Sequence, residues 1–179
     1  MSAAAAVTRV VRRCNDAAET QKLDLSSCIL ESFPDAVFHL LRNTVVLSCN
    51  LSNNNLKKVV GKLCQNFTQL TELNICDNQI DSLPDSIGLL TQLRTFAATQ
   101  NKLVGLPTSF YSLEKLETLE LGSNEITELD VERLCNMPAL KKVVLLGNPL
   151  TQEVHQQLLS NANFELIVSD VVDNFSDVD

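Results

Sequence analysis

The sequence predicts an α/β solenoid: six short repeats stack into a curved, parallel sheet, and a cap closes each end. Three observations support this fold class. Leucine occupies 30 of the 179 positions, far more than in an ordinary chain. The leucines recur with a fixed spacing, which is typical of repeat architectures. Between them, apolar and polar residues alternate with period two over short stretches, as in strands with one buried face.

The repeat follows the pattern L-x-x-L-x-L-x-x-N/C-x-L, and its ninth position gives the register. That position is Cys28 in the first repeat and asparagine in the other five, with successive spacings of 26, 24, 23, 23 and 24 residues (Asn54, Asn78, Asn101, Asn124 and Asn148). The third repeat is the most regular, with Leu70, Leu73, Ile75 and Ile80 at its apolar positions. The six repeats together predict a single domain whose solenoid covers residues 20–150.

Positions 4 and 6 of each repeat flank one residue, so both side chains point to the same side of a short strand and into the core. The asparagine at position 9 then turns the chain. Its side chain can bond backbone groups of neighbouring coils that would otherwise be buried without partners. Proline follows leucine in Leu83-Pro84 and Leu106-Pro107, where a residue without an amide hydrogen ends the buried turn.

Residues 1–19 predict an N-terminal capping helix, because a solenoid exposes an apolar edge at each end. One helix face is expected to be apolar and the opposite face to be charged with Arg9, Arg12, Arg13 and Asp16. The alternative for this arginine-bearing, acid-poor segment is a targeting peptide. The predicted apolar face consists of Val7, Val10, Val11, Cys14 and Ala18, at helical spacing.

Residues 151–170 predict the C-terminal cap, with Leu158 and Leu159 pointing inward and the alternating stretch Phe164-x-Leu166-x-Val168 behind them. From residue 151 onward the chain has acids but no lysine or arginine. Residues 171–179 are therefore expected to form a solvated acidic tail.

On these six aligned copies the chain resembles the leucine-rich-repeat family, over roughly residues 20–150, and most of all its small intracellular members that consist of little else. The resemblance implies a curved solenoid with a parallel sheet on its concave side. It also implies a protein-binding role, as an adaptor or an enzyme regulator.

Composition and motifs exclude several function classes. The formal net charge of −8 argues against nucleic-acid binding, which needs a basic surface. No apolar run is long enough for a transmembrane helix. The six cysteines are widely spaced without a CxxC motif, which favours reduced thiols. His39 and His155 have no ligand-spaced neighbours, so no metal is expected. We also expect no cofactor and no enzymatic activity, because no catalytic motif is present.

The candidate functional surface is the predicted concave face, onto which positions 3, 5 and 7 of each repeat should point. Residues 1–62 carry eight bases and five acids, whereas residues 63–179 carry six bases and seventeen acids. The acids on this face predict a protein partner with a basic segment. The predicted partner-binding residues are Asn50, Glu72, Asn74, Asp77, Glu117, Thr118, Glu120, Lys142, Val144 and Leu146.

The chain is expected to be a monomeric, cytoplasmic interaction module, with the nucleus left open as a location. The alternative is an extracellular or organellar repeat protein. The state of the six cysteines separates the two hypotheses, since disulfides form in oxidising compartments.

Overall fold

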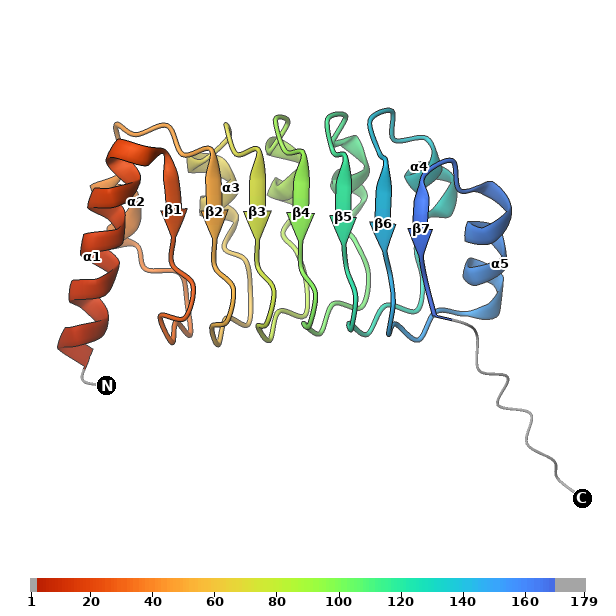
Figure 1. The fold of residues 1–179 in the computed structure, drawn as a ribbon, viewed down its shortest axis with the longest axis horizontal. Helices are drawn as coiled ribbons and strands as arrows, with labels where there is room; N and C mark the ends of the chain where they lie inside the picture. The colour runs from red at the N-terminus through yellow and green to blue at the C-terminus, as the bar shows by residue number, and fades with distance from the viewer. Residues whose placement is uncertain (1–2, 170–179) are drawn as a thin grey trace, which may run out of the picture.

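The computed structural model describes residues 3–169, and it confirms the α/β solenoid. Seven parallel strands follow one another in chain order in a single open, uncurled sheet (Figure 1). The face of this sheet that carries no helix is the predicted concave face, and is called the sheet face below. Each strand has three residues: β1 Lys22–Asp24, β2 Ser48–Asn50, β3 Glu72–Asn74, β4 Thr95–Ala97, β5 Thr118–Glu120, β6 Lys142–Val144 and β7 Glu165–Ile167.

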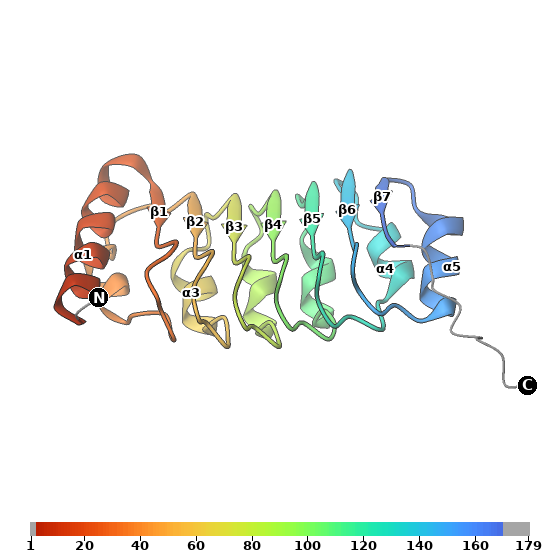
Figure 2. The same ribbon diagram turned by 60° about the horizontal axis from the view of Figure 1, so that its bottom comes forward.

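The elements behind the sheet are single turns of helix, and the two ends carry longer helices (Figure 2). The 3-10 helices η1 and η2 begin directly after Pro84 and Pro107, their N-cap residues, whose backbone is extended. The end helices are α1 Ala3–Thr20 and α5 Gln152–Asn161, and the elements behind the sheet are α2 Ala36–Leu40, α3 Gly61–Asn66, η1 Asp85–Leu89, η2 Thr108–Ser112 and α4 Val131–Cys135.

The strand register agrees with the predicted repeat alignment. Leu73 pairs with Cys49 on one side and with Phe96 on the other, and all three side chains are buried. Phe96 is 0% exposed and packs edge-on against Phe110, with ring centroids 5.3 Å apart, a favourable arrangement for two aromatic rings. The inward pair of Phe96 and the small Ala98 is therefore a packing solution, as predicted.

The predicted asparagine ladder is present. Asn101 is buried, its Oδ1 accepts from the amide of Ile80, and its Nδ2 donates to the carbonyl oxygens of Ile75 and Ala98. The other four ladder asparagines likewise accept from the preceding coil and donate to carbonyls of both coils.

Asn101→Ala should therefore lower the free energy of unfolding by about 1–3 kcal/mol, because it leaves buried backbone groups without partners. Urea denaturation measures the loss. Asn66→Ala, at an exposed position of α3, is the matched control and should change stability by less than about 0.5 kcal/mol. Equal losses in the two variants would contradict the ladder's role.

The buried face of α1 differs from the predicted one. Val10, Cys14 and Ala17 are buried, whereas Val7, Val11 and Ala18 are exposed. The arginines explain the rotation of the helix.

Arg13 was expected on the charged outer face, but its Nη1 donates to the Ser26 carbonyl at 2.5 Å and contacts Cys28 Sγ at 3.4 Å. Arg9 donates to the Ser27 carbonyl at 2.9 Å. Both arginines therefore cap the open edge of the first coil, where no preceding repeat supplies partners.

The C-terminal end also departs from expectation in two respects. Leu158 is buried as predicted, but Leu159 is 62% exposed on the outer side of α5, so its predicted inward position is wrong. The stretch predicted only as part of the cap contains a seventh strand, β7, which pairs with β6. The predicted acidic tail, residues 171–179, lies outside the described residues.

Candidate functional site

The outward side chains of the strands form two parallel rows on the sheet face. The strand register aligns position 3 of successive repeats as Lys22, Ser48, Glu72, Thr95, Thr118, Lys142 and Glu165. It aligns position 5 as Asp24, Asn50, Asn74, Ala97, Glu120, Val144 and Ile167. Seven of the ten predicted partner-binding residues lie in these rows.

Leu146 follows β6 by two residues and is 52% exposed. Asp77 and Glu117 lie outside the two rows. Asp77 is at position 8, in the turn after β3, with a left-handed φ of 53°. The same left-handed conformation recurs at position 8 of every predicted repeat, at Ser27, Asn53, Gln100, Ser123 and Gly147. Polar side chains that tolerate this conformation, or glycine, are expected there.

Glu117 is already paired within the chain. It lies at position 2, just before β5, and forms ion pairs with the position-2 residues of the two flanking repeats, Arg94 and Lys141. The hydrogen bond from Lys141, followed by that from Arg94, lowers the pKa of Glu117. Its charge is therefore compensated, and the acids of the two rows that form no ion pair among residues 3–169 are Glu72 and Glu120. Asp77, in the turn beyond the rows, also forms none there.

Glu72 and Glu120 have no basic partner within salt-bridge distance among residues 3–169. Glu72 accepts a hydrogen bond from Ser48 Oγ at 3.2 Å. Both carboxylates line a hollow of about 310 Å³ on the sheet face, together with Asn74 and Ala97. Ala97 is one of the smallest side chains in its row, so it leaves room between its larger neighbours.

The side-chain amides of Asn50 and Asn74, at position 5, are only partly bonded within the described part of the chain. Asn50 Oδ1 accepts from the amide of Ser52, and Asn74 Oδ1 accepts from the amide of Cys76. These local turns fix the orientation of each side chain. Neither Nδ2 has an acceptor in the described part of the chain, so both remain donors for a partner.

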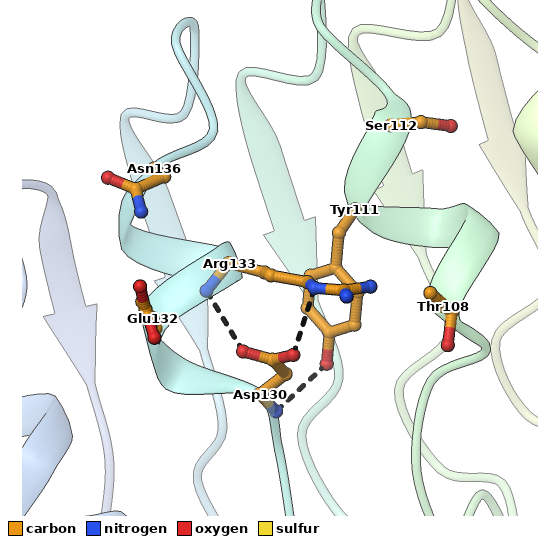
Figure 3. A pocket seen from close by; sticks show the side chains of 7 residues that line it. All are labelled: Thr108, Tyr111, Ser112, Asp130, Glu132, Arg133 and Asn136. Carbon is orange, nitrogen blue, oxygen red and sulfur yellow. Dashed lines mark hydrogen bonds and ion pairs between the residues drawn. The ribbon is translucent and has the colours of Figure 1, made fainter.

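A larger hollow, of about 580 Å³, lies on the other side of the molecule between η2 and α4 (Figure 3). Two of its three charged side chains are paired with each other: Asp130 accepts from the amide of Arg133 and forms an ion pair with its Nε at 3.2 Å, whereas Glu132 has no ion pair among residues 3–169. Tyr111 Oη accepts from the Asp130 amide, and burial raises the pKa of Tyr111. This hollow therefore lies where two repeats meet, and its contacts between Tyr111, Asp130 and Arg133 join η2 to α4.

The cysteines are all free thiols. Burial raises the pKa of Cys64 to about 11 and raises that of Cys49 further. At Cys76, burial is again the main cause of a raised pKa, and Asp77 and Glu120 add to it while hydrogen bonds with Thr99 oppose it. A thiol with a raised pKa is a poor nucleophile at neutral pH.

Iodoacetamide at pH 7.5 should therefore modify the native, unreduced protein slowly, with half-buried Cys76 and Cys135 ahead of buried Cys49. In denaturant without reductant all six should react, and mass spectrometry counts the adducts. Three resistant pairs in the denatured sample would instead indicate disulfides and favour the extracellular or organellar alternative.

Within residues 3–169 no three His, Cys, Asp or Glu side chains gather around a common point, and no helix has the length and hydropathy to cross a bilayer. The ring of His155 contacts the Ser169 carbonyl oxygen at 3.1 Å, so His155 joins α5 to the segment after β7 in the C-terminal cap.

Comparison with known proteins identifies the protein family to which the chain belongs. The Leucine Rich Repeat family model matches residues 69–90 and 115–137. The chain is 35% identical over 168 residues to Leucine-rich repeat-containing protein 20 of Mus musculus, covering 92% of this chain and 91% of the relative. The chain belongs to the leucine-rich-repeat family, as its sequence resemblance predicted.

The human protein of the same name gives the same identity and coverage of this chain, which confirms the likeness to a small repeat-only member. Among solved structures, the repeat protein LIC12759 of Leptospira interrogans aligns with a TM-score of 0.71 and 26% identity. The alignment covers 90% of this chain but 39% of that one. The ectodomain of the receptor kinase SOBIR1 from Arabidopsis thaliana, with a TM-score of 0.59 and 22% identity over 82% of this chain and 72% of that one, shares the fold.

Proposed function

We propose that this chain is a non-enzymatic interaction module that binds a protein partner on its sheet face, as an adaptor or an enzyme regulator. Leucine-rich-repeat proteins generally mediate protein–protein contacts. The observation that carries the choice of face is the unpaired state of Glu72 and Glu120 beside an open hollow. A rigid, preformed surface of this kind lowers the ordering cost of binding.

The partner in this proposal presents a basic segment to Glu72 and Glu120. Charges of this kind mainly govern the association rate and its salt dependence. The protein acts as a monomer in the cytoplasm, and six unpaired thiols support a reducing compartment. No nucleic acid, membrane or cofactor takes part. The extracellular or organellar alternative is tested by the alkylation experiment above.

Changing both Glu72 and Glu120 to lysine should slow association with such a partner about three- to tenfold at low salt, and it should flatten the salt dependence. The melting temperature should stay within about 2 °C, because both side chains lie on the surface. Partners recovered by proximity labelling are titrated against parent and variant at 50 and 300 mM salt.

The matched control changes Glu114 and Glu128 to lysine, which alters net charge equally at exposed positions outside the strands. It should associate almost as fast as the parent. Equal behaviour of the two double variants at both salt concentrations would remove the sheet-face acids from the site.

A further inference from the structure

An apolar patch lies in the position-5 row at the C-terminal end of the sheet face, where the other end of that row is polar. Val144 and Ile167 are adjacent in the strand register and both are half-buried, and Leu146 beside them is 52% exposed. The corresponding positions at the other end are Asp24 and Asn50. No helix or strand within residues 3–169 lies over the sheet face at β6 and β7, whose last residues are Val144 and Ile167 (Figure 1).

A carboxylate that forms no ion pair within residues 3–169 borders this apolar patch. Glu120 is the register neighbour of Val144 on β5 and lacks a basic partner. The adjoining row is neutral at this end, because Lys142 pairs with Glu165 at 3.3 Å. Along position 5 the surface therefore passes from a carboxylate to two aliphatic side chains on successive strands.

Resting on the proposed function, we infer that this end of the sheet face docks an extended segment of a partner protein with a lysine or arginine and an aliphatic residue two positions apart. Neighbouring strands lie about 4.8 Å apart. Alternate residues of an extended peptide point to the same side about 6.8 Å apart. A basic side chain over Glu120 therefore places the second residue between Val144 and Ile167, with either chain direction allowed.

The hollow over Ala97 extends this site on the side away from Val144. It lies between Asn74 and Glu120 in the register, and its volume of about 310 Å³ is at the lower end for small-molecule pockets. It can admit the long stem of a lysine or arginine whose head group reaches Glu72 or Glu120. An acidic or neutral side chain would bring no compensating charge to these carboxylates.

Charge also distinguishes the occupant from the chain's own segments. Residues 170–179 have four aspartates and no lysine or arginine, so they would add negative charge beside Glu120. A second copy docking through the same face would oppose like acids. A separate partner with a base next to an aliphatic residue complements both features of the patch.

The test is selection of phage-displayed random nonapeptides on the immobilised full-length chain. Enriched peptides should carry lysine or arginine two positions from valine, isoleucine or leucine. A synthetic peptide of the enriched sequence is then titrated by fluorescence anisotropy. Val144→Ser should weaken its binding about tenfold, by removing apolar contact. Glu120→Gln should weaken binding about threefold and reduce its salt dependence.

Matched controls use the same substitutions away from the sheet face. Val104→Ser, at a 59% exposed valine, and Glu128→Gln should leave the affinity of the peptide within about twofold of the parent. Circular dichroism melts verify that each variant is folded.

Two failures are distinguishable. Selected peptides that lose affinity in the Glu72/Glu120 double lysine variant, but lack the base–aliphatic spacing or ignore Val144→Ser, would overturn this inference and leave the proposed function standing. Peptides and partners that bind the double lysine variant as well as the parent would overturn the proposed function itself.

Discussion

Leu119→Ala should lower the free energy of unfolding by about 2–5 kcal/mol. Leu119 is the central residue of β5 and is 0% exposed, between Phe96 on β4 and Val143 on β6. Truncation removes apolar contacts with both neighbouring coils and leaves a cavity that these short strands cannot easily close. Guanidinium denaturation followed by circular dichroism measures the change.

Leu159→Ala is the matched control, since it deletes the same atoms from a side chain that is 62% exposed. It should alter stability by less than about 0.5 kcal/mol. A large loss of stability in the Leu159 variant with none in the Leu119 variant would contradict the placement of Leu119 in the core and of Leu159 on the surface. Because each repeat contacts only its neighbours, a lesion in the fifth repeat should also separate the unfolding of the two ends.

The strand register was predictable because one residue type at a fixed spacing encodes it. Each ninth-position asparagine side chain bonds the preceding coil and its own coil, so the spacing of these residues reports the length of each coil directly. The 26-residue step between Cys28 and Asn54 accommodates α2, which has Val37 and Phe38 buried. The alternation of apolar and polar residues within each strand then predicted which side chains point inward.

Contacts between side chains of different repeats were harder to predict. The pairing of Glu117 with Arg94 and Lys141 joins residues 23 and 24 positions apart, outside the pattern that defines the strands. The sequence feature that could have revealed this pairing is the alternation of charge at position 2 of three successive repeats. Ile167 was missed for another reason: the last repeat lacks the asparagine, so the alternation around Leu166 suggested a cap instead of a seventh strand.

The rotation of α1 has a physical cause that helical periodicity could not reveal. Both the valine-rich face and the face of Val10, Cys14 and Ala17 satisfy helical spacing. The choice depends on carbonyl groups of the first coil, which accept hydrogen bonds from Arg9 and Arg13. Partner groups that are distant in sequence decided the orientation.

Removal of residues 1–20 should abolish cooperative unfolding and cause aggregation. The deletion uncovers the apolar edge formed by Leu23, Leu25 and Cys28, which are at most 3% exposed in the intact chain. It also takes away the donors for the carbonyl oxygens of Ser26 and Ser27. Size-exclusion chromatography and thermal denaturation of the truncated and full chains measure both effects.

Point variants separate the capping contacts from the bulk of the helix. Arg13→Ala should destabilise the full chain by about 1 kcal/mol, less than a buried charged hydrogen bond, because the side chain is 26% exposed. Arg12→Ala, one residue away and exposed, should have almost no effect. A truncated chain that stays soluble and melts like the parent would contradict the capping role and favour a removable targeting peptide, since the first coil would then need no cover.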